Sequence, residues 1–248
     1  MHKNIRPKWN LSMPKESWAI NIDIEGFSKN YEESEDRKTY AIWGLHQLMD
    51  AVIKIGNEVY PDPPERLFAH QFGDGFLIAS DFYEESSDRP IAIATALMRH
   101  MLLNGYATKA AISTGGMSDI KGCYPKSVRD SEDGSTHMGA GVLTSIPVMG
   151  TALTRAHKLS GVKSGFQLIV DTTRFRNHSS YKSVAEPKGI ELIDWLNSEI
   201  SLAGEIAAKA GLSSAGTESL AENLEKYIKT APEPPESWIA SSRKVLCQ

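Results

Sequence analysis

WAINIDIEGF, residues 18–27, carries the pattern from which the fold is predicted. Apolar side chains at 18, 20, 22 and 24 alternate with smaller or polar ones at 19, 21 and 23. A period of two is typical of a β-strand whose two faces meet different surroundings. The stretch therefore predicts a strand over residues 18–24 that carries an acidic side chain, Asp23, close to its end.

The segments that follow alternate between helical and extended patterns. Apolar residues recur every three or four positions over 38–59, which predicts a helix. The run 90–103, with Pro90 in its first turn, predicts a second one. Between them, two apolar runs flank Gly-Asp-Gly at 73–75, which is typical of a β-hairpin over 66–79. Residues 106–114 predict a strand that ends at the glycine pair 115–116.

Strand, helix, hairpin, helix and strand form the split βαβ arrangement. We therefore expect an α/β (α+β) fold with a ferredoxin-like βαββαβ core and a mainly antiparallel sheet flanked by helices. In such a sheet we expect the first strand to lie beside the first strand of the hairpin.

The second half of the chain is less regular. Residues 121–137 are polar and predict a loop or a mobile arm, and the apolar spacing of 200–229 is helical. We expect a lead over 1–17, a catalytic domain over 18–198 and a helical extension over 199–248, in which Trp238 and Ile239 dock back. Between the arm and the extension we expect one helix and three strands, at 149–159, 166–170, 181–185 and 190–196.

Composition narrows the class of protein. The net charge of −4 does not favour a nucleic-acid binder with a broad basic face. The two cysteines, Cys123 and Cys247, form no metal or disulfide pattern. No apolar run reaches the roughly 18 residues of a membrane span, and the first residues have no apolar signal core. We therefore expect a cytoplasmic protein that binds neither membranes nor nucleic acids.

Two acidic residues carry the candidate chemistry. Asp23 lies near the end of the first strand and Asp74 at the tip of the hairpin. Each alone is compatible with a structural role, Asp23 as a turn cap and Asp74 as the Asp of an Asp-Gly turn. Two carboxylates held together repel each other unless a cation lies between them. Mg²⁺ or Mn²⁺ would use such oxygens together with phosphate oxygens, and two ions brace an in-line displacement.

Five segments together resemble the catalytic domain of class III adenylyl and guanylyl cyclases. NIDIEGF and HQFGDGF resemble the two metal motifs, and KAAISTGG resembles the strand that follows them. PVMGTALTRAHKL and PKGIELIDWL resemble, more weakly, the late helix and the lysine-bearing strand. The resemblance runs from about residue 18 to 196 in the order of the family. It implies the class III cyclase fold and the conversion of a nucleoside triphosphate to a 3′,5′-cyclic monophosphate plus pyrophosphate.

The resemblance also implies roles for residues around the metals. Asp23 and Asp74 would bind two Mn²⁺ or Mg²⁺ ions per site, and Ile24 would add its backbone carbonyl. Gly26 and Phe27 belong to the segment that would cover the triphosphate. The 3′-oxygen of the nucleotide would attack the α-phosphate.

The family forms its site between two subunits arranged head to tail, which implies a homodimer. Lys188 matches the lysine that contacts the terminal phosphate. The Asn and Arg that stabilise the transition state are replaced here by Thr154 and Lys158. Lys158 keeps the charge but lacks the bidentate fork of arginine, and the neighbouring Arg155 points to another side of a helix.

The base-reading positions carry His70 and Pro147, which match neither the adenine nor the guanine set of the family. In this respect the chain is similar to bacterial pyrimidine cyclases of two-gene antiphage (Pycsar) systems. That resemblance implies UTP first and CTP second as the substrate, and a separate effector that reads the cyclic nucleotide. The alternatives are a purine cyclase and a nucleotide-sensing homologue that has lost catalysis.

Overall fold

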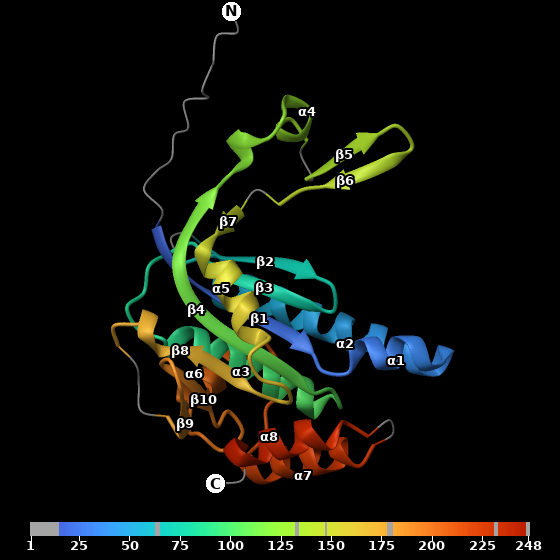
Figure 1. Cartoon of the computed structure of the whole chain (residues 1–248), viewed down its shortest axis with the longest axis vertical. Helices are drawn as coiled ribbons and strands as arrows, with labels where there is room; N and C mark the ends of the chain where they lie inside the picture. The colour runs from blue at the N-terminus through green and yellow to red at the C-terminus, as the bar shows by residue number, and fades with distance from the viewer. Residues whose placement is uncertain are drawn as a thin grey trace, which may run out of the picture.

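A computed structural model describes residues 15–62, 65–131, 134–146, 148–177, 181–230 and 233–246. Pro147 and Cys247, like most of the predicted lead 1–17, lie outside the described residues. One large sheet forms the centre of the molecule, with helices on its two faces (Figure 1). The predicted mixed α/β fold with a mainly antiparallel sheet is confirmed.

The strand order within the main sheet is β2-β3-β1-β4-β8-β10-β9, and β7 pairs with β4 off this path. Only the β4–β8 pair is parallel among the described strands. The strands are β1 (Lys15–Ile24), β2 (Leu67–Phe72), β3 (Gly75–Ser80), β4 (Thr108–Asp119), β7 (Val148–Gly150), β8 (Leu168–Asp171), β9 (Ser183–Glu186) and β10 (Ile190–Ile193).

The order β2-β3-β1-β4 is that of the ferredoxin-like core, but it corrects one expectation. The neighbour of β1 is β3, the second strand of the hairpin, and β2 lies outside it at the edge of the sheet. The physical reason is the crossover: the helix between β1 and β2 spans a gap in the sheet, and the hairpin then folds β3 back into it.

The two faces of β1 contact different layers. Trp18, Ile20, Ile22 and Ile24 belong to the large core, which is covered by α2 (Glu35–Lys54) and α3 (Asp88–Leu103). On the opposite face, Ala19 packs with Ala152 and Ala156 of α5 (Thr151–Ser160). Small side chains let α5 lie close to the sheet, over the face that carries Asp23. A short helix, α1 (Phe27–Glu33), connects β1 to α2.

Strand β4 continues through Gly115 and Gly116 to Asp119, so the predicted end at these glycines is wrong. The glycines serve packing instead. A Cβ at Gly115 would lie 2.4 Å from Thr151 Oγ1 and 2.7 Å from the backbone nitrogen of Ala152. Glycine at this position therefore permits the close approach of α5 to β4.

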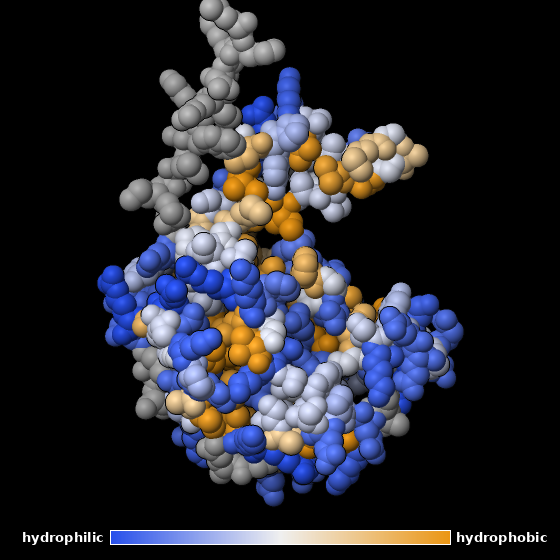
Figure 2. Space-filling model, in the orientation of Figure 1, coloured by the Kyte–Doolittle hydropathy of each residue, from blue (hydrophilic) through white to orange (hydrophobic). Residues whose placement is uncertain are grey.

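Residues 120–146, which we call the arm, extend away from the sheet after β4 (Figure 1). The arm contains two short helical segments and a two-stranded hairpin, whereas the sequence predicts a loop or a mobile arm over 121–137. Exposed apolar side chains lie on it and just after it, and Figure 2 shows orange patches along this projection. They are Met138, Val142, Leu143, Ile146 and Met149. The elements of the arm are η2 (Lys121–Cys123), α4 (Lys126–Arg129), β5 (Ser135–Met138) and β6 (Gly141–Thr144).

The C-terminal helices share the core of the sheet layer. Their buried apolar residues, among them Ile206, Leu224 and Val245, belong to the same cluster as β1 and α3. Trp238 and Ile239 also pack against this core, as the sequence predicts. The division at residue 198 thus remains a prediction about sequence organisation. The helices are α6 (Ser201–Lys209), α7 (Thr217–Ile228) and α8 (Glu236–Leu246).

Candidate functional site

The candidate site begins with three residues that lie side by side on β3, β1 and β4. Asp23 pairs with Gly75 on one side and with Lys109 on the other. Residues directly opposite in antiparallel strands point to the same face of a sheet. Asp74 precedes Gly75 in the turn that follows Gly73, whose φ of 63° is the left-handed conformation that favours glycine. The structure thus brings Asp23 and Asp74 together at one end of the sheet.

The side-chain amide of Asn21 holds the carboxylate of Asp23 in place. Asn21, on the same face of β1, donates a 2.7 Å hydrogen bond from Nδ2 to Asp23 Oδ2. Asn21 itself is buried, because α5 covers this face. The period-two pattern places residues 19, 21 and 23 on one small or polar face, but it does not identify Asn21 as a partner of the carboxylate.

Burial dominates the electrostatics of the site. It raises the pKa of Asp23 above its ordinary value of 3.8, and the neighbouring Asp74 acts in the same direction against the hydrogen bond from Asn21. Burial also raises the pKa of Asp74, and its own backbone and Lys109 oppose the shift. The nearby positive charges, Lys109 for both carboxylates and His157 for Asp23, only partly offset this effect of burial. This is the environment in which a divalent cation is most stabilising.

Glu25 and Lys109 form an ion pair that the sequence analysis missed. Lys109 Nζ lies 3.1 Å from Glu25 Oε1, and the two side chains are 16% and 5% exposed. The backbone of Glu25 is also fixed: its N–H donates to Ala107 O at 3.0 Å, and Tyr227 Oη of α7 donates to its carbonyl at 3.4 Å. Lys109 begins the strand KAAIST, but only the pairing with Asp23 places it in the site.

A polar cavity of about 480 Å³ opens beside these residues. Asp23, Asp74 and Ile24 line it, as do Gly26 and Phe27 at the start of α1. Gly26 has a φ of 76°, a conformation that a glycine adopts without strain, and it turns the chain from β1 into α1. Lys109 of β4, His157 of α5 and Trp238 of α8 also line it. Segments far apart in the sequence thus meet at the end of β1.

Three of the predicted residues lie elsewhere in the same chain. Thr154 and Lys158 are exposed on α5 and do not line the cavity, and the Thr154 hydroxyl donates within its own helix to Gly150 O at 3.4 Å. Lys188 is exposed in the turn between β9 and β10, where its φ is 69°. In the same subunit, the α5 residue that reaches the cavity is His157, whose ring contacts Phe72 at a centroid distance of 5.3 Å.

His70 shares a strand face with a residue that lines the cavity but does not line the cavity itself. It lies on β2 two residues before Phe72 and therefore on the same face of the strand. Phe72 lines the cavity, and His70 does not. Partial burial lowers the pKa of His70 below its ordinary value of 6.5, which favours the neutral imidazole. A neutral ring has one donor and one acceptor nitrogen.

The described residues also bear on metals and membranes. They contain no group of three or more His, Cys, Asp or Glu side chains that would hold a metal by itself. A site built on Asp23 and Asp74 needs other oxygen ligands, such as a backbone carbonyl and phosphate. Within the described ranges, no helix combines the length and the apolarity that a membrane crossing requires.

No family model and no curated protein sequence matches the chain. Among solved structures, it is similar to a class III adenylyl cyclase-like ATP-binding protein from Pseudomonas aeruginosa, with 14% identity and a TM-score of 0.47. The match covers 88% of this chain and 44% of that one, so the chain spans less than half of that protein. It is also similar to the catalytic core of a rhodopsin-guanylyl cyclase with converted specificity, in complex with ATPαS. Here the identity is 8% and the TM-score 0.39, over 73% of this chain and 96% of the other.

Proposed function

We propose that the protein is a nucleotidyl cyclase that converts a nucleoside triphosphate to a 3′,5′-cyclic monophosphate and pyrophosphate. One observation carries the proposal: Asp23 and Asp74 converge at the mouth of a polar cavity that the start of α1 also lines. A cavity of about 480 Å³ is within the range of small-molecule sites. The carboxylates, the glycine turn and the lysine match the needs of a triphosphate held through divalent cations.

The residues present fit Mn²⁺ or Mg²⁺. Both carboxylates are partly buried, the charge of Asp74 adds to the raised pKa of Asp23, and Lys109 only partly offsets their burial. Hard cations prefer such oxygen ligands. Asp23 and Asp74 would hold the ions through their side chains and Ile24 through its carbonyl. Bound there, two ions would supply charge stabilisation to the nucleophile and the phosphates.

The protein residues would orient the substrate. Gly26 and Phe27 would cover the triphosphate, while Asn21 keeps the Asp23 carboxylate in one orientation. Lys109 lines the same cavity and would add positive charge near the phosphates, although it is tied to Glu25. In the reaction, a bond forms between the 3′-oxygen and the α-phosphorus, and the bond from that phosphorus to the pyrophosphate oxygen breaks.

We propose a homodimer with a shared site. Thr154 and Lys158 project from the exposed side of α5, outside the cavity of their own chain, so a second copy would have to receive them. Lys188 would reach the terminal phosphate from the same partner. The apolar side chains on and near the arm, Met138 and Leu143 among them, support such an association because contiguous exposed apolar surface is typical of interfaces.

For the base we propose a pyrimidine, UTP before CTP, with His70 as the reader. His70 shares the cavity-side face of β2 with Phe72 and is held neutral, so its two nitrogens offer a donor and an acceptor to uracil. The product would act as a second messenger in antiphage defence through a separate effector. We place the catalytic domain at 18–198, the extension at 199–248 and the protein in the cytoplasm.

The rival with a structural observation in its favour is a catalytically inactive nucleotide sensor. The Thr154 hydroxyl is satisfied by carbonyls of its own helix, at 3.4 Å from Gly150 O and 3.3 Å from Thr151 O. One experiment separates the readings. The purified protein is incubated with Mn²⁺ and each of the four nucleoside triphosphates, and products are identified by mass spectrometry. Cyclic UMP supports the proposal, a purine product supports the ordinary cyclase, and binding without turnover supports the sensor.

A further inference from the structure

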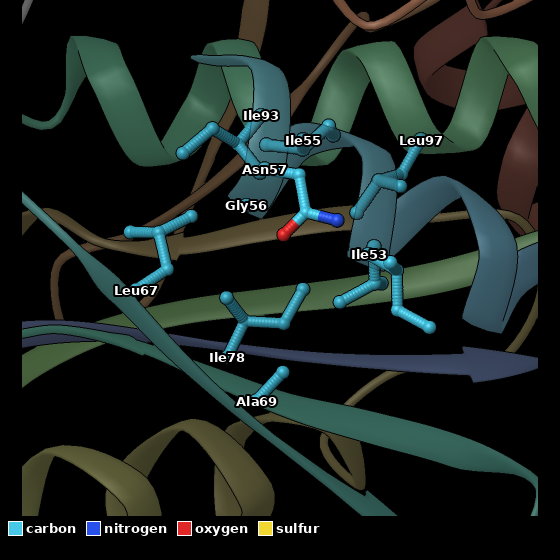
Figure 3. Close-up of a pocket in the computed structure, with 10 residues that line it drawn as sticks. Ile53, Ile55, Gly56, Asn57, Leu67, Ala69, Ile78, Ile93 and Leu97 are labelled. Carbon is cyan, nitrogen blue, oxygen red and sulfur yellow. The ribbon is translucent and has the colours of Figure 1, made fainter. Parts of the chain in front are cut away.

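A second pocket lies on the face of the sheet opposite Asp23. Its walls come from the end of α2, the π-helical turn η1 (Ile55–Val59), the hairpin strands β2 and β3, and α3 (Figure 3). Ala69 and Ile78 are directly paired across the hairpin and form the sheet side. Ile93 and Leu97 of α3 form the helical side. The pocket is therefore separated from the polar cavity by the thickness of the sheet.

The lining of this pocket is apolar with one exception. Among the described residues that line it, Asn57 is the only one with a polar side chain, and Figure 3 shows the Asn57 amide pointing toward Ile78 and Ala69. Ile55, Ile78, Ile93 and Leu97 are buried and form the floor, each at most 1% exposed. No charged residue in the described part of the chain lines the pocket, so a nucleotide or a phosphate would lose its hydration there without compensation.

The pocket is open to solvent at its rim. Ile53 is 53% exposed, and Asn57 and Ala69 are also exposed. The π-helical turn accounts for part of the space. Its wider ring is closed by the Tyr60 N–H, which donates to Ile55 O at 3.3 Å, and a Cβ at Gly56 would meet no atom within 4 Å. Such π-turns are frequent at functional sites.

We propose that this pocket binds a small uncharged molecule with one aromatic ring system, single or fused, and a single hydrogen-bonding group, which would contact Asn57. The cavity volume of about 180 Å³ limits the size of the ligand, since an apolar cavity of roughly 150 Å³ accommodates benzene. The amide of Asn57 both donates and accepts, so it serves an N–H or an O–H of the ligand. The proposal concerns binding alone and is independent of the cyclase reaction.

Indole is a suitable probe, and benzene lacks its hydrogen-bonding group. Binding to the full chain is measured by calorimetry and by ligand-observed NMR, without nucleotide or metal. We expect indole to bind with a Kd on the order of 1 mM or tighter. Ala69→Leu would fill the pocket from the sheet side and weaken indole at least about tenfold. Ala185→Leu is the matched control, because Ala185 is an exposed alanine on β9, the opposite edge strand of the same sheet.

A second variant tests the polar contact. Asn57→Leu changes an exposed side chain at the rim, so it leaves the buried floor intact. It should weaken indole by about two- to tenfold and leave benzene unaffected. Thermal melts confirm that each variant is folded. The proposal is overturned if indole does not bind the wild-type protein at about 10 mM, far above the expected Kd, or if Ala69→Leu binds it as well as Ala185→Leu does. Equal losses for indole and benzene in Asn57→Leu would overturn the role of Asn57.

Discussion

Asp23 lies directly against Gly75, and no larger residue fits there. A Cβ at Gly75 would come within 2.1 Å of Asp23 Oδ1 and 2.3 Å of the carbonyl oxygen of Ile22. The missing side chain is therefore what lets the Asp23 carboxylate lie over the base of the hairpin, next to Asp74. The glycine after Asp74 serves this contact as well as the turn.

Gly75→Ala should abolish Mn²⁺ binding and lower the melting temperature, because the new Cβ overlaps both the carboxylate and the backbone of β1. Isothermal titration with Mn²⁺ and a thermal melt measure the two effects. Gly204→Ala is the control: Gly204 is exposed within α6, and a Cβ there meets nothing within 4 Å. That control should gain up to about 1 kcal/mol of stability. Unchanged Mn²⁺ affinity in Gly75→Ala would contradict the site.

Asp23→Ala and Asp74→Ala should each reduce turnover by at least about a thousandfold, since both carboxylates would hold the ions that stabilise the transition state. Both variants should fold, because neither side chain belongs to the apolar core. Burial is the main cause of the raised pKa of Asp23, and the charge of Asp74 adds to it. Without metal, Asp74→Ala should therefore melt higher than wild type at pH 7, since it relieves that repulsion. Asp50→Ala, on the surface of α2, is the control. Full activity in either site variant would refute the metal assignment.

Mixing two inactive variants tests the shared site. Asp74→Ala and Lys158→Ala subunits, each inactive alone, should regain activity on mixing, because a heterodimer contains one intact pair of half-sites. The expected level is at most about one quarter of wild type, as half of the dimers are mixed and each has one working site. Sedimentation measures the oligomeric state. A mixture that stays inactive despite demonstrated subunit exchange, or an active monomer, would rule the arrangement out.

His70 should govern the choice of base. The wild-type protein should turn over UTP well above ATP and GTP, and His70→Ala should lose roughly tenfold or more of that preference. Its Mn²⁺ affinity should stay close to wild type, since His70 does not line the cavity of the carboxylates. His46→Ala, an exposed histidine on α2, is the control. Comparable kcat/KM for ATP and UTP in the wild-type protein would remove the pyrimidine proposal and leave the cyclase proposal standing.

His100 should make stability depend on pH. It is 6% exposed, its Nδ1 accepts from Ser213 N–H at 3.0 Å, and its Nε2 has no partner among the described residues. Burial, together with the nearby Lys54, lowers the pKa of His100 below its ordinary value of 6.5. The unfolded chain then binds a proton that the folded chain excludes. The neutral, buried His100 therefore contributes fully to the free energy of unfolding above pH 6.5. This contribution is lost as the pH falls toward the lowered pKa of His100.

The melting temperature of the wild type should therefore fall between pH 7 and pH 5 more steeply than that of His100→Gln. Differential scanning calorimetry at matched ionic strength measures the slopes. His46→Gln, at an exposed position, should keep the wild-type slope. Parallel curves for wild type and His100→Gln would show that His100 does not titrate on unfolding in this range.

Local patterns in the sequence are enough to specify the elements of the core. The period-two pattern of 18–24 specifies β1, and the Gly-Asp-Gly at 73–75 specifies the turn between β2 and β3. Both signals are local, because a strand face and a turn conformation depend on residues a few positions apart. They also predict that Asp23 and Asp74 meet. The predicted neighbour of β1, the first strand of the hairpin, is wrong.

The surroundings of the two carboxylates depend on tertiary contacts. Lys109 and Gly75 flank Asp23 through strand pairing, and Tyr227 reaches Glu25 from a helix some two hundred residues later in the chain. The second pocket likewise depends on which faces of β2, β3 and α3 meet. Strand register and helix packing are settled by burial of the whole core, and a side chain's partner across the sheet leaves no mark in its own sequence neighbourhood.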